Sequence, residues 1–150
     1  MTRVCLLGEP DLRLRYELVS RETSRDALST YDLEEPYLNT VALETVSLGA
    51  AVSLLNDLSW YLVRFVRDAF VLEPSVSEAE WLSRSVANAI RDEELVPAES
   101  GRFLKIYGVD DGELVEPMFA ARTGPTRPEY DLREVDDTLV VRVTESEFEV

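Results

Sequence analysis

The sequence contains no histidine and no glutamine, and it has only one cysteine and one lysine. Without histidine, a catalytic triad built on imidazole and a metal site with imidazole ligands are both excluded. A single cysteine, Cys5, excludes an internal disulfide and the multi-cysteine sites that bind zinc or iron–sulfur clusters. Because Cys5 lies in an apolar run with few basic neighbours, we expect a small buried side chain there and not a reactive thiol.

Motifs that bind nucleotides or calcium are also missing. No P-loop and no EF-hand loop occurs, and no further glycines after Gly8 complete a dinucleotide-binding fingerprint. Two carboxylate pairs, Asp110 with Asp111 and Asp136 with Asp137, have the oxygen ligands that Mg²⁺ or Ca²⁺ would need. Both pairs lie in predicted turns of a chain with 30 acidic residues. We interpret them as solvated turn residues, and we predict no metal and no cofactor.

Long apolar runs are absent as well. The best candidate, 46–55, is too short to cross a membrane and is followed at once by Asn56 and Asp57. The apolar run at 4–7 is too short for the core of a signal peptide. We therefore expect a soluble cytoplasmic protein that does not enter a membrane.

Acidic side chains dominate the charged residues of the sequence. The chain has 30 acidic and 15 basic residues, a net charge of −15. No block of five or six like charges occurs, which excludes an acidic tail. A mimic of nucleic acid remains one interpretation. Adaptation to molar salt is the other, because a Debye length of about 3 Å screens the repulsion between surface carboxylates. Acidic residues that occur throughout the chain without long blocks, and the near absence of lysine, favour salt adaptation. The same charge argues against nucleic acid as a partner.

The acid is concentrated in the second half of the chain. Residues 1–72 have 7 basic and 11 acidic side chains, whereas residues 73–150 have 8 and 19. The net charges are therefore −4 and −11, and a surface in the first half can contact a partner more easily. The length of 150 residues corresponds to one domain.

Hydrophobic periodicity predicts the elements of this domain. The expected strands are 2–8, 40–47, 137–145 and one that contains Pro117. This last strand must be an edge strand or irregular, because proline cannot donate to the ladder. The expected helices are 12–31, 48–72 and 77–95, the first with Leu12, Tyr16 and Val19 on its buried face and the last with Ser77 and Glu80 as a capping box. Residues 97–109 fit a helix slightly better than a strand, and 123–132 fit a loop. We predict a single α+β domain over 1–150, with a mixed or largely antiparallel sheet of about four strands, about three covering helices and a loose tail at 144–150.

The predicted helix 48–72 has an unusual polar side. Asn56, Trp60, Arg64 and Arg67 follow one another by steps of four, four and three, so a continuous helix would align them opposite its apolar face. Asp57 would lie beside this polar stripe, within reach of Tyr61 and Arg64. The stripe combines an aromatic ring, an amide and a cation that could stack on the ring.

Three interpretations of the polar stripe stay open. It is the solvated side of a core helix, or a surface for a protein partner or a second copy of the chain, or a site for a small anionic ligand or substrate, with or without Mg²⁺. Aromatic and arginine side chains are enriched at binding hot spots, and catalytic motifs are missing elsewhere. The sequence therefore favours a non-catalytic interaction protein over an enzyme.

Three segments resemble an uncharacterised family of small acidic proteins from halophilic archaea. They are "SRETSRDALSTYDL", "NTVALETVSLGAAVSLLNDLSWYLVRF" and "FLKIYGVDDGELVEP". The resemblance implies a cytosol rich in potassium salt. It provides no catalytic residues that could be transferred to this chain.

Overall fold

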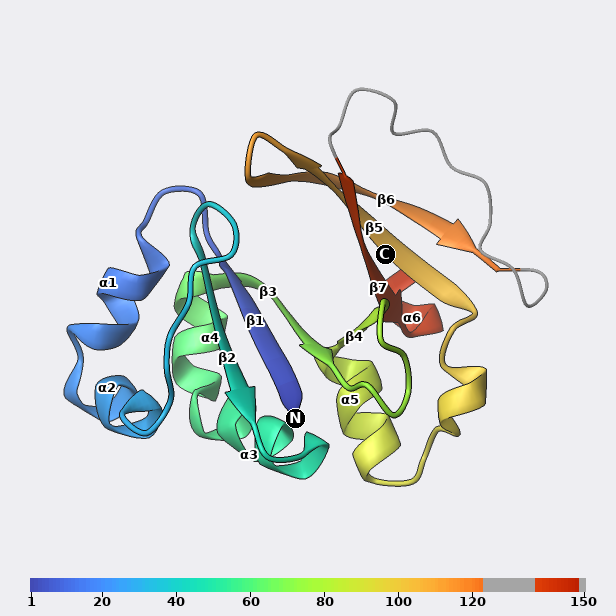
Figure 1. Cartoon of the computed structure of the whole chain (residues 1–150), viewed down its shortest axis with the longest axis horizontal. Coiled ribbons are helices and arrows are strands. Elements are labelled where there is room, and N and C mark those ends of the chain that lie inside the picture. Colours follow the sequence, from blue (N-terminus) through green and yellow to red (C-terminus); the bar gives the residue numbers. More distant parts are fainter. Residues whose placement is uncertain (123–136, 149–150) are drawn as a thin grey trace.

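Seven strands form one sheet in the computed structural model, which describes residues 1–122 and 137–148 (Figure 1). The strands are β1 (Thr2–Gly8), β2 (Thr40–Thr45), β3 (Val66–Leu72), β4 (Trp81–Ser83), β5 (Phe103–Asp110), β6 (Glu113–Ala121) and β7 (Asp137–Val143). The helices are α1 (Leu14–Val19), α2 (Glu22–Leu28), α3 (Leu48–Asp57), α4 (Ser59–Phe65), α5 (Arg84–Arg91) and α6 (Glu145–Phe148), with a short 3₁₀ turn at Pro97–Glu99. The strand order is β2-β1-β3-β4-β7-β5-β6.

The predicted class is confirmed, whereas the predicted size of the sheet is wrong. All neighbouring strands are antiparallel except β4 and β7, which are parallel, so the sheet is mixed and largely antiparallel. We expected about four strands and three helices, and the described residues form seven strands and six α-helices. The additional elements come from predicted helices that are divided or replaced by strands.

The segment 48–72 is not one helix. Helix α3 ends at Asp57, a break at Leu58 separates it from α4, and the chain becomes extended at Val66 to form β3. Strand β3 pairs with β1 and β4, and it is buried on both faces at its centre. A short apolar run of this kind cannot be distinguished from a buried helix by periodicity alone.

The other two predicted helices are also divided. Segment 12–31 contains α1 and α2, which are separated at Ser20 and Arg21. In segment 77–95, Ser77 does accept hydrogen bonds at the start, but the chain then forms β4, and the helix begins only at Arg84 with Ser83 as its cap. The Glu80 carboxylate does not return to the backbone of Ser77, as a capping box requires, and it binds two arginines of distant segments.

The remaining predictions concern the C-terminal half. Residues 97–109, for which a helix was slightly favoured, form the 3₁₀ turn and then β5, so the favoured alternative is wrong. The strand with Pro117 is β6, which does lie at the sheet edge, as predicted. The expected loop at 123–132 lies outside the described residues. Within the expected tail, Thr144 is followed by α6, and Phe148 packs against Phe103.

Two hydrophobic cores lie on opposite faces of β1–β3. Val4 and Leu6 of β1 contribute to the first core, which α1–α5 cover. Cys5 and Leu7 point to the second core, which side chains of β5 and β7 complete. In Figure 1, β5–β7 cross obliquely over the end of the β1–β3 strands, on the side away from α1 and α2. The sheet therefore curls enough for its two ends to share a core, and α1 and α4 are left with an outer surface.

Candidate functional site

A loop junction at the end of β1 shapes the candidate site. The carbonyl oxygen of Asn39 accepts from the Gly8 N–H at 2.9 Å, and the Asn39 side chain bonds to Leu14 N at 2.9 Å and to Glu9 O at 3.0 Å. Asn39 has φ 55°, a left-handed conformation that asparagine tolerates better than most residues. A Cβ on residue 8 would lie 2.8 Å from both Asn39 Nδ2 and Leu14 Cβ, so glycine is required at this close approach. These contacts fix α1 against the loop that precedes β2.

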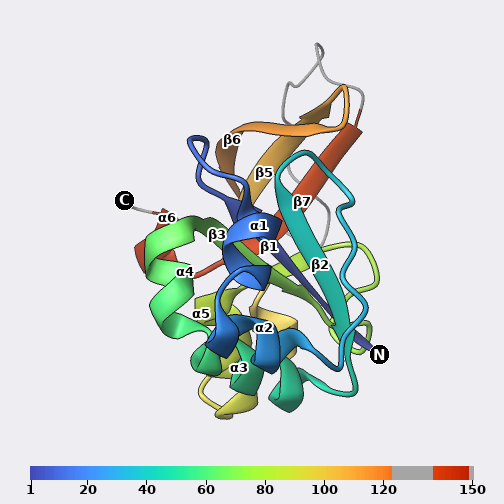
Figure 2. The same cartoon turned by 90° about the vertical axis from the view of Figure 1, so that its left-hand side faces the viewer.

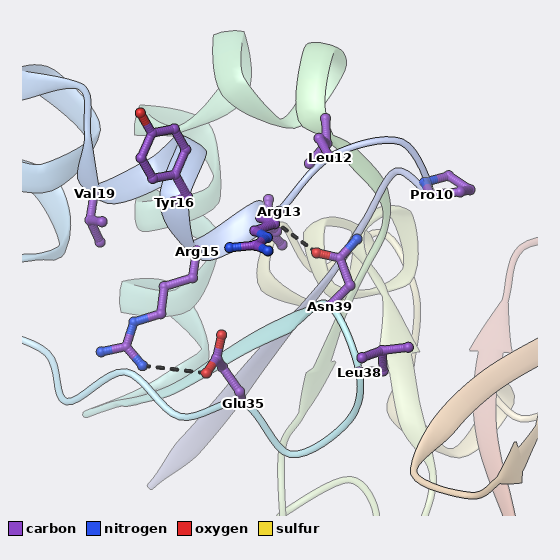
Figure 3. Close-up of a pocket in the computed structure, with 10 residues that line it drawn as sticks. Pro10, Leu12, Arg13, Arg15, Tyr16, Val19, Glu35, Leu38 and Asn39 are labelled. Carbon is purple, nitrogen blue, oxygen red and sulfur yellow. Dashed lines mark hydrogen bonds and ion pairs between the residues drawn. The ribbon is translucent and has the colours of Figure 1, made fainter.

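A cavity of about 610 Å³ lies between α1 and this loop (Figure 3). Its lining is mainly apolar and includes Pro10, Leu12, Val19 and Leu38. A neighbouring cavity of about 430 Å³ shares Pro10, Leu12, Arg13 and Tyr16 with it. The two cavities therefore form one hollowed area around the exposed side of α1, with a volume in the range of small-molecule or side-chain binding sites.

Arginine supplies the charge of this hollow. Arg15 pairs with Glu35 at 3.6 Å, on the wall that Figure 3 shows. Arg13 occupies the N-cap position of α1 without a side-chain capping hydrogen bond, and it forms no ion pair with any described residue. An apolar hollow with an unneutralised guanidinium is suited to a group that combines apolar surface with a carboxylate.

A chain of contacts joins this hollow to α4. Glu17 pairs with Arg21 at 3.0 Å, and the Arg21 guanidinium lies 4.8 Å from the centre of the Phe65 ring. Phe65 in turn meets Trp60 edge to face, with 6.2 Å between ring centres. Figure 2 shows α4 beside α1 on this side of the molecule. We name this continuous surface the α1–α4 face, and it consists of Arg13, Tyr16, Glu17, Arg21, Leu38, Trp60, Val63, Arg64 and Phe65.

The α1–α4 face exposes several large apolar side chains to solvent. The exposed fractions are 64% for Tyr16, 63% for Leu38, 49% for Trp60 and 80% for Val63. Scattered exposed apolar residues need no explanation, but a contiguous group with stacked arginines is typical of a contact surface.

The structure brings together some of the residues of the predicted polar stripe. Arg64 stacks on Trp60 with 3.8 Å from its Cζ to the ring centre, as predicted, and its Nη1 donates to the Trp60 carbonyl oxygen at 2.9 Å. Tyr61 is 9% exposed and packs in the first core. Asp57 is exposed and forms no ion pair with Arg64 or any other described residue.

The other two residues of the predicted polar stripe, Asn56 and Arg67, are not aligned with Trp60. Asn56 accepts a hydrogen bond from Arg84 at 3.1 Å, at the end of α3. Arg67 lies on β3 and pairs with Glu116 of β6 at 3.0 Å. The continuous helical stripe is therefore wrong, because α4 ends before Arg67.

Sequence reasoning missed the contribution of α1. We placed Tyr16 on a buried face, yet Leu14 and Leu18 are the buried residues of α1, and Tyr16 points outward. The sequence did contain a signal for the correct buried face, because Leu14 and Leu18 are four residues apart and therefore lie on one side of a helix. Arg13 and Leu38 gave no signal, because only the tertiary contact of Asn39 with the end of β1 makes them part of a cavity.

A polar cluster lies inside the second core, away from this face. Asp68 Oδ2 accepts from Lys105 Nζ at 2.8 Å and from the Tyr107 hydroxyl at 2.6 Å. Burial, together with the negative charge of Asp68, raises the pKa of Tyr107 well above its ordinary value. Tyr107 is thus held as a neutral donor, and the only lysine of the chain is used in an internal ion pair.

The carboxylate pairs that could supply oxygen ligands for Mg²⁺ or Ca²⁺ are not part of a larger cluster in the described residues. No group of three or more histidine, cysteine, aspartate or glutamate side chains is placed to hold a metal ion in residues 1–122 and 137–148. Asp110 and Asp111 lie at the β5–β6 turn, where Asp111 and Gly112 have φ of 52° and 77°. Asp136 lies outside the described residues, and Asp137 is the first residue of β7.

The fold and this face define an α+β protein with one mixed sheet and an exposed aromatic–arginine surface. A family of unknown function, DUF5804, matches residues 2–109, so the chain belongs to this family. No curated protein and no solved structure matches the chain. Each helix in the described part of the chain is too short or too polar to cross a membrane.

Proposed function

We propose that this protein is a non-catalytic interaction protein that binds a protein partner through the α1–α4 face. The observation that carries the proposal is the continuity of this face. Tyr16, Trp60 and Val63 are exposed, and contacts from Glu17 to Arg21, from Arg21 to Phe65 and from Phe65 to Trp60 link α1 to α4. Exposed aromatic and arginine side chains dominate binding energy at protein interfaces.

The charge of the face indicates the chemistry of the partner. Around the hollow and the stacked rings, four arginines (Arg13, Arg15, Arg21 and Arg64) are accompanied by three acids (Asp11, Glu17 and Glu35). In the whole chain, acids outnumber bases by two to one. The partner therefore presents an apolar segment with at least one carboxylate, the apolar part on Tyr16 and Trp60 and the carboxylate toward Arg13.

The proposal includes a salt-rich cytoplasm as the working environment. The net charge of −15 and the single lysine support it. In molar salt, charge–charge attraction between surfaces is screened within about 3 Å. Apolar contacts keep their strength there, since salts that are excluded from protein surfaces strengthen apolar burial. A binding face built on rings and aliphatic groups suits these conditions better than one built on ion pairs.

A small-ligand-binding protein is the second candidate function. The cavity of about 610 Å³ beside Arg13 favours it, because an anionic molecule with an apolar body would fit that lining. Its site differs from the sequence-based one at Asp57, Tyr61 and Arg64. In this case the hollow alone would bind the ligand, and Trp60 and Val63 would be irrelevant to binding.

The test compares two valines of equal exposure. Val63 lies on the α1–α4 face, Val46 lies at the far end of β2, and both are 80% exposed. Affinity enrichment from source lysate in molar KCl is quantified by mass spectrometry for wild type, Val63→Asp and Val46→Asp. We expect a protein that is recovered with wild type and Val46→Asp and lost with Val63→Asp. Equal recovery with all three proteins would refute the proposal.

A further inference from the structure

A second cavity lies between α4, β3, α5 and α6, apart from the hollow around α1. Its volume is about 200 Å³. Leu62, Val63, Val66 and Ala69 form an apolar lining, and four charged side chains complete it. They are Arg67 and Asp68 of β3, Arg84 of α5 and Glu147 of α6. Two cations and two anions thus line one small space.

These charges do not neutralise one another. No ion pair joins Arg67 or Arg84 to Asp68 or Glu147 within the described residues. Arg67 pairs with Glu116, which lies outside the cavity lining, and Asp68 pairs with Lys105. Arg84 and Glu147 are therefore the two lining residues whose charge no ion pair with a described residue neutralises, and this charge is available to a bound molecule.

Hydrogen bonds hold both carboxylates in place. Asp68 Oδ2 accepts from Lys105 and Tyr107, and its Oδ1 accepts from the Ala69 N–H at 3.0 Å, so both of its oxygens are engaged. Glu147 Oε1 accepts from the Ser83 hydroxyl at 2.7 Å and from the Thr144 N–H at 2.9 Å, so its second oxygen stays uncommitted. Fixed carboxylates bind a cation with little loss of side-chain entropy.

Arg84 provides the opposite charge. Its Nη2 donates to Asn56 Oδ1 at 3.1 Å and, more weakly, to the Leu55 carbonyl oxygen at 3.4 Å. Its Nε is buried without a partner, and its Nη1 makes no hydrogen bond to a described residue. The guanidinium is therefore anchored through Nη2, and its Nη1 keeps unused donors that can reach a carboxylate.

We infer that this cavity binds a small zwitterion with an aliphatic side group, of the size and chemistry of an apolar α-amino acid. The carboxylate of the ligand is bound by Arg84, its ammonium group by Glu147, and its side group by the apolar lining. The site borders the α1–α4 face at Val63, which belongs to both, but the charged residues that would bind the zwitterion lie outside that face, and the inference does not depend on the proposed partner binding.

The experiment uses L-leucine and two analogues that each lack one charge, 4-methylpentanoate and 3-methylbutylamine. Dissociation constants are measured by ligand-observed NMR on the full chain in KCl. Loss of one charge-assisted interaction weakens binding about tenfold or more. We expect L-leucine to bind with a millimolar or lower dissociation constant, and each analogue to bind about tenfold more weakly.

Variants connect this preference to the proposed residues. In Arg84→Gln, L-leucine and 3-methylbutylamine should bind equally, because the partner of the carboxylate is gone. In Glu147→Gln, which keeps an oxygen for Ser83 and Thr144, the preference for L-leucine over 4-methylpentanoate should shrink. Arg91→Gln and Glu145→Gln change exposed residues of the same two helices and serve as matched controls.

Three results would overturn the inference. One is the absence of L-leucine binding to the wild type. Another is equal affinity for L-leucine and either analogue. The third is unchanged L-leucine binding in either Arg84→Gln or Glu147→Gln, with circular dichroism confirming that the variant is folded.

Discussion

Replacement of Asp68 by alanine should destabilise the protein more than replacement of any exposed carboxylate. Asp68 joins β3 to β5 through Lys105 and Tyr107, across the second core. Tyr107 is 1% exposed, so its hydroxyl would be left buried without a partner, at a cost of about 1–3 kcal/mol. The side chain of Lys105 is 22% exposed, and loss of its charged partner adds about 1–2 kcal/mol after an allowance for solvent.

The expected loss is therefore about 3 kcal/mol, a large share of the roughly 5–15 kcal/mol that stabilises a domain of this size. Urea unfolding in molar KCl measures it, since guanidinium chloride is itself a salt and would change the screening. Asp57→Ala is the control, because Asp57 is exposed and has no ion pair in the described structure. It should stay within about 0.5 kcal/mol of wild type.

Two further variants separate the contributions. Asp68→Asn keeps an oxygen that can accept from Tyr107, so it should lose only about half as much stability as Asp68→Ala. Tyr107→Phe in the Asp68→Ala background should cost less than in the wild type, since the hydroxyl has already lost its acceptor. Equal free energies of unfolding for Asp68→Ala and Asp57→Ala would refute the role assigned to this cluster.

Three other predictions concern the reactivity of Cys5, the stability in acid and the stability at low salt. Burial raises the pKa of the Cys5 thiol to about 12, so a thiol reagent at pH 8 should react with Cys5 only after unfolding in urea. Rapid reaction of Cys5 in the folded protein would contradict this prediction. Burial would raise the pKa of Glu80, but hydrogen bonds from Arg122 and Arg142 outweigh it and lower the pKa. The stabilisation that Glu80 provides is thus present at neutral pH and lost in acid, so urea titrations of wild type and Glu80→Gln should differ at pH 7 and converge as the pH falls below 4.5. The melting temperature should fall when molar KCl is reduced to millimolar, because carboxylate repulsion is then unscreened, and an unchanged value would contradict salt adaptation.

The parts of the fold that the sequence predicts are those with local signals. Strand β1 was expected at 2–8 because an apolar run ends in Gly8 and a turn sequence, and the structure has it at Thr2–Gly8. The edge position of β6 followed from Pro117, whose ring removes a backbone donor. The stacking of Arg64 on Trp60 followed from a spacing of four within one helix.

The parts that failed depend on partners distant in the sequence. Strand β3 is apolar on both faces because the two cores meet there, and this removes the alternation that would distinguish it from a helix. Ser77 begins a local turn, but residues 81–83 then pair with β3 and β7, and Glu80 forms ion pairs with Arg122 and Arg142, so these partners all lie far away in the sequence. The hollow around α1 exists because Asn39 binds the end of β1, which no pattern in either segment indicates.

Site-specific photocrosslinking tests the central claim most directly. A photoreactive amino acid is placed at position 63 in one sample and at position 46 in another, two sites with the same side chain and the same exposure. After irradiation in source lysate at molar KCl, we predict a discrete crosslinked product from position 63 and none at that mass from position 46. Its mass distinguishes a second copy of the chain from another protein. If position 63 gives no crosslinked product that is absent from position 46, the assignment of the α1–α4 face as a binding surface is contradicted.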